Sequence, residues 1–127
     1  MRFNTLLEQS EPICFPPVDG VRRFRNLMIP MRDHIQLAAD VYLPDTGDAD
    51  AAFPVVMEYI PYRKDQVDLS ARPFYTYLAR KGYLVVRVDI RGTGASPGKN
   101  LDEYLLQEQE DGYDCVEWIA AQSWCDG

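Results

Sequence analysis

The 127-residue sequence has only one histidine, only three cysteines and no excess of basic residues. The cysteines are widely spaced and form neither a C-x-x-C redox motif nor a zinc-binding pattern, so we expect no metal and no cofactor. Twenty acidic residues against thirteen basic ones give a formal charge of -7 at pH 7. Because nucleic-acid binding depends on neutralising phosphates with basic side chains, we expect no nucleic-acid partner.

Long apolar runs are also missing. No stretch approaches the roughly 20 apolar residues that span a membrane, and Pro12 with its acidic neighbour interrupts the region where a secretion signal needs an apolar segment. Cys14, Cys115 and Cys125 cannot all pair with one another, so we expect free, buried thiols in a reducing compartment. These features predict a cytoplasmic protein without a membrane partner and leave its oligomeric state open.

The composition, with 46% hydrophobic and 26% charged residues, is typical of one soluble globular domain. Residues 1–20 contain Pro12, Pro16, Pro17 and Gly20 and have no periodicity, which predicts an irregular lead-in before a domain over 21–127. Two alternating runs around Arg32-Asp33-His34 predict a β-hairpin over 21–44. A loop over 45–52 then leads to an apolar strand over 54–60, which we expect to be buried on both faces.

Two helices alternate with strands in the second half of the chain. A helix over about 72–81 is predicted to end before Gly82, with one face formed by Phe74, Tyr77 and Leu78. A strand over 83–90, a glycine-rich loop and a helix over 108–122 follow. The apolar stripe of that last helix is expected to comprise Gly112, Val116, Ile119, Ala120 and Ser123. Its solvated acidic face is expected to comprise Glu110, Asp114 and Glu117.

This order of elements predicts an α/β fold, in which an antiparallel hairpin precedes the start of a mainly parallel sheet with helices. The last helix has no strand after it, although a crossover helix normally connects two parallel strands. We therefore expect the chain to be interrupted rather than complete.

Ser96 lies in the sequence Gly94-Ala95-Ser96-Pro97-Gly98, which matches the G-x-S-x-G pattern of nucleophilic serines. That pattern requires a serine on a tight turn between a strand and a helix, whereas here a glycine-rich loop continues on both sides. The residue after the nucleophile must also donate its N–H to the oxyanion, and proline has none. We therefore interpret Ser96 as an ordinary loop serine.

The same loop resembles nucleotide-binding motifs through Gly92-x-Gly94 and Gly98-Lys99. A dinucleotide site needs a helix that begins within the glycines, and a P-loop needs Ser or Thr where Asn100 stands. His34 follows Asp33 at the hairpin tip, where we expect a turn residue with positive φ rather than a catalytic base. The loop residues Asp45, Asp48 and Asp50 lack the spacing of a calcium site, so we expect them to be solvated.

Four segments in order resemble one family of enzymes. They are M-R-D-H-I-Q-L-A-A-D-V-Y-L-P, P-V-V-M-E-Y-I-P-Y-R-K, Y-L-A-R-K-G-Y-L-V-V-R-V-D-I-R-G-T-G-A-S-P-G and E-D-G-Y-D-C-V-E-W-I-A-A-Q-S-W-C-D-G. Together they make residues 31–127 similar to the N-terminal part of cocaine-esterase and X-prolyl dipeptidyl-peptidase-like (CocE/NonD type) α/β-hydrolases. The resemblance implies an incomplete α/β-hydrolase fold that stops before the strand and turn bearing the nucleophilic serine. The family usually has glycine where His34 stands, which concerns turn geometry and not chemistry.

The resemblance also implies a role for Tyr62, in Ile60-Pro61-Tyr62, because the matching tyrosine donates its hydroxyl to the oxyanion hole. A phenol with a pKa of about 10 stays protonated at neutral pH and is suited to that role. The segment Asp89-Ile90-Arg91-Gly92 would then be a structural turn. The missing nucleophile strand would lie beside the strand over 54–60, so we expect the isolated chain to expose an apolar edge and to aggregate.

The sequence therefore predicts the N-terminal fragment of a serine hydrolase that acts on small esters, amides or peptides, inactive by itself. The ester or peptide substrate stays undetermined. A complete small non-catalytic α/β binding module is the alternative, and it requires a closed sheet and a covered last helix. A small nucleotide-binding protein is a third hypothesis, and it requires phosphate affinity at residues 92–98.

Overall fold

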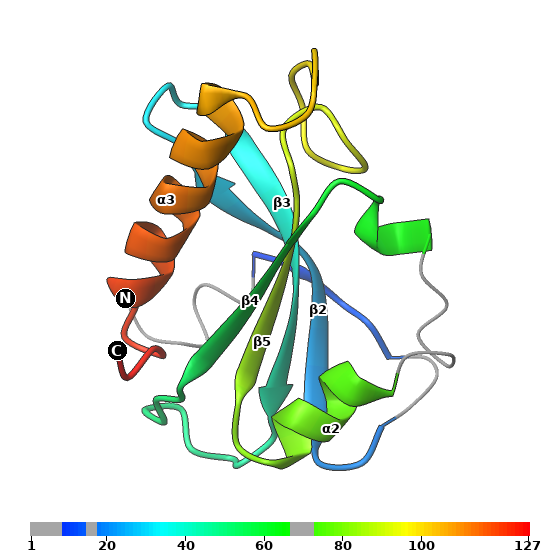
Figure 1. Ribbon diagram of the computed structural model, residues 1–127. Coiled ribbons are helices and arrows are strands. Elements are labelled where there is room, and N and C mark those ends of the chain that lie inside the picture. The colour runs from blue at the N-terminus through cyan, green and yellow to red at the C-terminus, as the bar shows by residue number, and fades with distance from the viewer. Residues whose placement is uncertain (1–8, 15–17, 67–72) are drawn as a thin grey trace.

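The computed structural model describes residues 9–14, 18–66 and 73–127. They form a mixed sheet with the strand order β1-β2-β3-β5-β4 (Figure 1). The strands are β1 (Glu11–Pro12), β2 (Val21–Pro30), β3 (Gln36–Pro44), β4 (Val55–Ile60) and β5 (Leu84–Asp89). The helices are η1 (Lys64–Gln66, a 3-10 helix), α2 (Phe74–Arg80) and α3 (Leu106–Ala120).

The predicted hairpin is confirmed as the antiparallel pair β2 and β3. Its tip closes with a hydrogen bond of 2.7 Å from the Met31 N–H to the Ile35 carbonyl oxygen. His34 has φ 70° there, as the prediction of a turn residue requires. The pairing shifts between Phe24 and Leu27, and Asn26 in this bulge has φ 59°.

The strand, helix, strand order after the hairpin is also confirmed. β4 and β5 are parallel neighbours, and α2 lies in the connection between them. The end of α2 is defined by Gly82 (φ 97°), whose N–H donates to the Ala79 carbonyl while the Tyr83 N–H donates to the Leu78 carbonyl. These two hydrogen bonds form a Schellman cap, which satisfies the last carbonyls of the helix and returns the chain to the sheet.

The two faces of the sheet are packed by different helices. α3 and α2 lie on opposite sides of the strands (Figure 1). Alternate residues of β5 supply both faces, so Leu84, Val86 and Val88 pack in the cluster that includes Cys115 and Ile119 of α3. The face toward α2 is different, because beside Val85 and Tyr42 it buries the charged residues Asp40, Arg87 and Asp89.

The predicted faces of both helices are only partly correct, with Leu78 of α2 packed against the core and Ile119 of α3 buried as expected. In α2, Tyr75 and Ala79 are buried, whereas Phe74 and Tyr77 of the predicted face are exposed. In α3 the buried residues are Asp111, Cys115 and Ile119, so the packed stripe is rotated by about one residue from the prediction. Val116, Ala120 and Ser123 are exposed. The rotation follows from Asp111, a carboxylate that a hydropathy pattern assigns to solvent but that pairs with Arg91 under the helix.

The strand β4 is not buried on both faces, because it is the edge of the described sheet and its residues are mostly half-buried. Among the described strands, β5 is buried on both faces, and so is β3 after Gln36. The irregular lead-in was also predicted too broadly, since Glu11 and Pro12 pair with β2.

All three cysteines are free thiols, as predicted. Cys115 is buried, which raises the pKa of its thiol to about 12, whereas Cys125 is half-buried and Cys14 is exposed, contrary to the expectation of burial. Among the described residues, no helix has the length and apolar character needed to cross a membrane.

Candidate active site

The carboxyl ends of β4 and β5 lie at the same edge of the sheet because the two strands are parallel. The Ile90 N–H donates to the Ile60 carbonyl at 3.2 Å, so the two chain segments leave the sheet together. Pro61 then ends β4, and the next residue is Tyr62, whose side chain is 77% exposed. The tyrosine implied as an oxyanion donor therefore lies on an open surface at the edge where α/β proteins bind ligands.

The loop that bears Tyr62 turns back into the protein within two residues. Arg63 has φ 61°, a conformation that is uncommon for a residue with a side chain. The next residue, Lys64, is buried, and its N–H donates to Asp89 Oδ1 at 2.7 Å. The exposed tyrosine is thus tied by the backbone to the end of β5.

The Lys64 side chain enters a buried polar group that the sequence did not reveal. Its Nζ lies 2.8 Å from Asn26 Oδ1, 3.0 Å from Asp40 Oδ1, 3.3 Å from Asp65 Oδ1 and 3.9 Å from Asp89 Oδ2. We call these five residues the Lys64 cluster. Burial raises the pKa of Asp40, and the neighbouring Lys64 ammonium opposes part of that rise. The cluster joins β2, β3, β5 and the loop after β4.

The glycine-rich loop after β5 folds around Asp89. A Cβ on Gly94 would collide with the Asp89 carboxylate, and the Ala95 N–H donates to Asp89 Oδ2 at 3.0 Å. The Gly92 N–H donates to Pro97, and the Ser96 N–H donates to Thr93. These amides are therefore occupied by the loop itself, whereas a phosphate-binding loop needs free ones.

The hollow beside this loop has a volume of about 20 Å³, close to that of a single water molecule, and is lined in part by Arg91, Lys99 and Asn100. α3 begins only at Leu106, well after the glycines. The loop therefore does not have the geometry of a nucleotide-binding site.

Ser96 is a structural residue. Its Oγ donates to the Asp89 carbonyl at 2.7 Å and accepts from the Ala38 N–H at 2.9 Å, and the side chain is buried. His34 is exposed at the hairpin tip and is not among the bonding partners of Ser96. The interpretation of Ser96 as a non-nucleophile is supported, although its role in joining the loop to β3 was not foreseen.

A second group of ion pairs ties the hairpin tip to α3. Arg91 binds Asp33 (2.7 Å) and Asp111 (2.8 Å), and Arg32 binds Asp114 (2.7 Å). We call these five residues the tip clamp. The bonds from the arginines lower the pKa of Asp33 and of Asp114 and raise the pKa of Arg91. Asp114, predicted to be solvated, is therefore a bonding partner of the tip, whereas Glu117 is exposed as expected.

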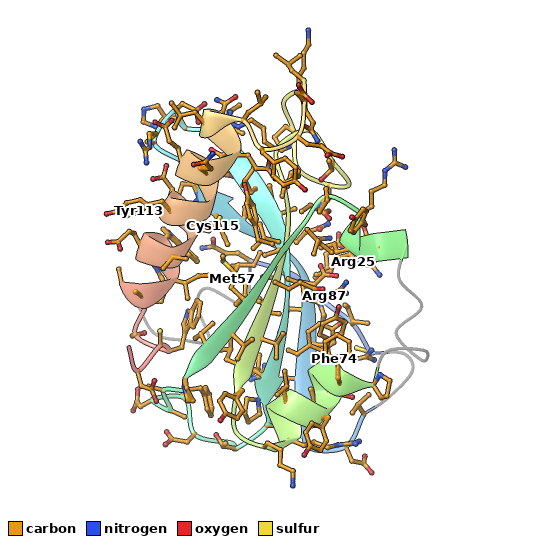
Figure 2. All side chains as sticks on the ribbon, in the orientation of Figure 1. Arg25, Met57, Phe74, Arg87, Tyr113 and Cys115 are labelled. Carbon is orange, nitrogen blue, oxygen red and sulfur yellow. The ribbon has the colours of Figure 1, made fainter. Side chains whose placement is uncertain are left out.

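Arg87 is another buried charge that sequence patterns missed. Figure 2 shows it on the side of the sheet that faces α2, away from Met57 and Cys115. Its Nε donates to Glu58 Oε2 at 2.8 Å, and its guanidinium lies 4.1 Å from the centre of the Tyr75 ring. Burial is the largest single influence and disfavours the charged form, but the bond to Glu58 together with the interactions with Tyr42 and Tyr75 outweighs it, so the pKa of Arg87 lies above its usual value. These contacts tie β4 to β5 and α2.

The acidic loop over 45–52 is joined to the start of β2 by the Asp45 N–H, which donates to the Gly20 carbonyl at 2.9 Å. Asp48 accepts from the Asp50 N–H at 2.9 Å, and Asp45, Asp48 and Asp50 are exposed. Within residues 9–14, 18–66 and 73–127, no three His, Cys, Asp or Glu side chains lie together as metal ligands.

Comparisons with known proteins agree with this geometry. The family model of the X-Pro dipeptidyl-peptidase (S15 family) matches residues 33–127. Cocaine esterase from Rhodococcus sp. (strain MB1 Bresler) is 39% identical over 104 residues, which are 80% of this chain and 17% of that protein.

Solved structures share the fold. A CocE/NonD family hydrolase from Staphylococcus aureus superposes with a TM-score of 0.70 at 28% identity, over 84% of this chain and 21% of that one. An acetyl xylan esterase from Paenibacillus sp. R4 has a TM-score of 0.66 at 14% identity, over 93% and 42%, and shares the fold alone. This chain spans about a fifth of the length of the cocaine esterase and of the S. aureus hydrolase. Because the S15 model matches most of this chain, residues 33–127, the chain belongs to the X-Pro dipeptidyl-peptidase (S15) family of hydrolases.

Proposed function

We propose that these 127 residues are the N-terminal portion of a serine hydrolase that cleaves esters or amides, with N-terminal dipeptides ending in proline among the candidate substrates. A serine beyond this chain attacks the substrate carbonyl, and a histidine takes the serine proton and passes it to the leaving group. Tyr62 and a backbone amide donate hydrogen bonds to the oxygen that becomes negative in the tetrahedral intermediate.

The observation that carries this proposal is the position of Tyr62. Its phenol is exposed at the carboxyl edge of the parallel strands. The next residue, Arg63, has a positive φ, and the one after it, Lys64, is buried and bonded to Asp89. An oxyanion donor must be fixed before the reaction, because a mobile donor would lose the stabilisation to its own reorganisation. An exposed hydroxyl on an anchored loop is accessible to a substrate and is held in place before the reaction.

The edge of β4 supports the proposed place of the nucleophile strand. After α3 the chain returns to this edge, where Cys125 pairs in parallel with Phe53 and the Phe53 N–H donates to the Trp124 carbonyl at 2.9 Å. A strand that continued in this direction would pair with β4. Its side chains would fill a groove of about 160 Å³ whose lining includes Val55, Met57 and Val116.

The open groove also gives a physical reason for the exposure of Val116 and Ala120, which the hydropathy pattern assigns to a buried stripe. With the outer edge of β4 unpaired and the groove uncovered, the 127-residue chain by itself is expected to be inactive and to aggregate through this edge. A soluble monomer with cooperative unfolding would contradict that expectation.

Replacing Tyr62 with phenylalanine in the complete hydrolase tests the proposal. Loss of one oxyanion donor should lower kcat about 10²- to 10³-fold and change KM little. A chromogenic ester and an X-prolyl anilide would report kcat and also distinguish the two substrate classes. Tyr77→Phe is the matched control, because Tyr77 is also exposed but lies on α2.

Unchanged kcat in Tyr62→Phe would refute the assignment of Tyr62 to the oxyanion hole. If the complete protein hydrolysed neither substrate and contained no reactive serine, the alternative of a non-catalytic α/β binding module would replace the proposed function.

A further inference from the structure

Lys64 has an unusual position for a lysine on an edge loop. Its side chain is fully buried, although Pro61, Tyr62 and Arg63 immediately before it are exposed. A buried ammonium is costly unless charged and polar groups surround it. Burial of this lysine therefore has an energetic cost, and the groups around it indicate which part of the structure it stabilises.

The strands are shaped to receive the ammonium. In β2 the bulge places Asn26 at φ 59°, and its backbone N–H donates to Asp40 Oδ1 at 3.2 Å. The Asn26 side chain is thereby directed at Lys64, whose Nζ donates to Asn26 Oδ1 at 2.8 Å. Two residues with positive φ, Asn26 and Arg63, thus meet at one lysine from elements far apart in the sequence.

Asp89 holds the same loop by its main chain. One carboxylate oxygen accepts the Lys64 N–H and the other accepts the Ala95 N–H. Both the backbone and the side chain of Lys64 are therefore fixed to the sheet, two residues after Tyr62. Rotation of the loop about Pro61 would have to break these bonds together.

We propose that Lys64 is a positioning residue, which through the Lys64 cluster fixes the loop so that the Tyr62 hydroxyl points to the oxyanion. The inference rests on the proposed function of Tyr62. Lys64 itself touches no substrate; it acts by holding the backbone on which the donor is carried. Its removal should have the same kinetic signature as removal of the hydroxyl.

A double-mutant cycle in the complete hydrolase tests this role. Lys64→Met should lower kcat about 10²-fold with little change in KM, since misplacing a catalytic group by about 1 Å has an effect of that size. In the Tyr62→Phe background the same replacement should cost less than about threefold, because two changes that act through one group are not additive. Amide exchange of residues 61–66 should accelerate in Lys64→Met.

Two further variants keep the result interpretable. Asn26→Gly accepts the positive φ but removes one acceptor from Lys64, so it should give a smaller, equally non-additive loss of kcat and decides the matter if Lys64→Met does not fold. Val21→Ala is the control for general destabilisation, because Val21 is buried beside Tyr75 in the cluster under α2. It should leave kcat and the exchange of residues 61–66 unchanged.

The outcomes separate the two proposals. Normal kcat in Tyr62→Phe would refute the role of Tyr62. A low kcat in Tyr62→Phe with normal kcat in the folded Lys64 and Asn26 variants would refute the positioning role alone. Equal losses from Lys64→Met in both backgrounds would also refute it, because the lysine would then act on the whole fold.

Discussion

The Lys64 cluster and the tip clamp join the same end of the sheet to its surroundings, and both use carboxylates around a basic side chain. They differ in burial. The Lys64 side chain is 0% exposed with Asp40 at 5%, whereas Asp33 and Arg32 of the tip clamp are 42% and 51% exposed. Water screens the exposed part of the tip clamp, Asp33 and Arg32, more strongly than the buried Lys64–Asp40 pair, so equal distances correspond to unequal energies.

The difference has a functional side. The buried cluster lies directly under the loop of Tyr62, where a fixed geometry is needed, while the tip clamp holds a hairpin turn for which the structure gives no chemical role. A buried charge group that is costly to break is suited to fixing one conformation. An exposed ion pair orients the hairpin tip at a small desolvation cost, and its loss should change stability little.

Breaking the buried cluster should have the largest effect. Lys64→Met leaves Asp40 without its cation in the interior, and we expect the free energy of unfolding to fall by about 3–5 kcal/mol. Native-state hydrogen exchange of the β3 and β5 amides measures this change in the complete protein. Adding Asp40→Asn should restore part of the loss, because it removes the unpaired charge but keeps an acceptor for the Asn26 N–H. No recovery would contradict the electrostatic origin of the effect.

Breaking the more buried half of the tip clamp should have an intermediate effect. Arg91→Gln leaves the nearly buried Asp111 carboxylate with a weaker partner, so a loss of about 1–3 kcal/mol is expected from the same exchange measurement on α3. Arg32→Gln is the matched control on the exposed half and should change much less. A larger loss for Arg32→Gln would reverse the ranking by burial.

Lowering the pH should change the stability contributions of the two groups in opposite directions. This effect should be smaller than those of the two sets of substitutions above. The pKa values of Asp33 and Asp114 are lowered in the folded protein, so their stabilisation is present above the unfolded pKa of about 3.9 and disappears as the pH falls through the lower folded values. Burial raises the pKa of Asp40, so its protonation at low pH favours the folded state.

Stability measured between pH 6 and pH 3 should therefore decline less steeply in Asp33→Asn and Asp114→Asn than in the unmodified protein. Asp40→Asn should not reduce the decline. If Asp40→Asn alone flattened the profile, the assignment of the acid-sensitive groups to the tip clamp would be incorrect.

Local patterns were sufficient to predict the hairpin, the strands β4 and β5, and both α-helices to within about two residues at each end. These elements have a clear period or a terminal signal such as Gly82, which acts within a few residues of the chain. The buried faces of the helices were not predictable in the same way. Asp111 is buried because Arg91 reaches it, and no hydropathy pattern contains that pairing.

The anchoring of the candidate site was likewise hidden from the sequence. Asn26, Asp40, Lys64 and Asp89 are separated by tens of residues, and a lysine after Pro61-Tyr62-Arg63 is expected to be exposed. The bulge in β2, the pairing of β3 with β5 and the turn at Arg63 bring these groups together. Tyr62 itself was identified from the resemblance to a family, because neither its spacing nor its composition distinguishes it from the other tyrosines.

The most direct test of the central claim is the intact mass of the endogenous protein before and after treatment with a fluorophosphonate that reacts with activated serines. We predict a species far heavier than 14.6 kDa that contains these peptides and gains one adduct. A native species of 14.6 kDa without an adduct would contradict the account, and the chain would then have to be explained as a non-catalytic member of a hydrolase family.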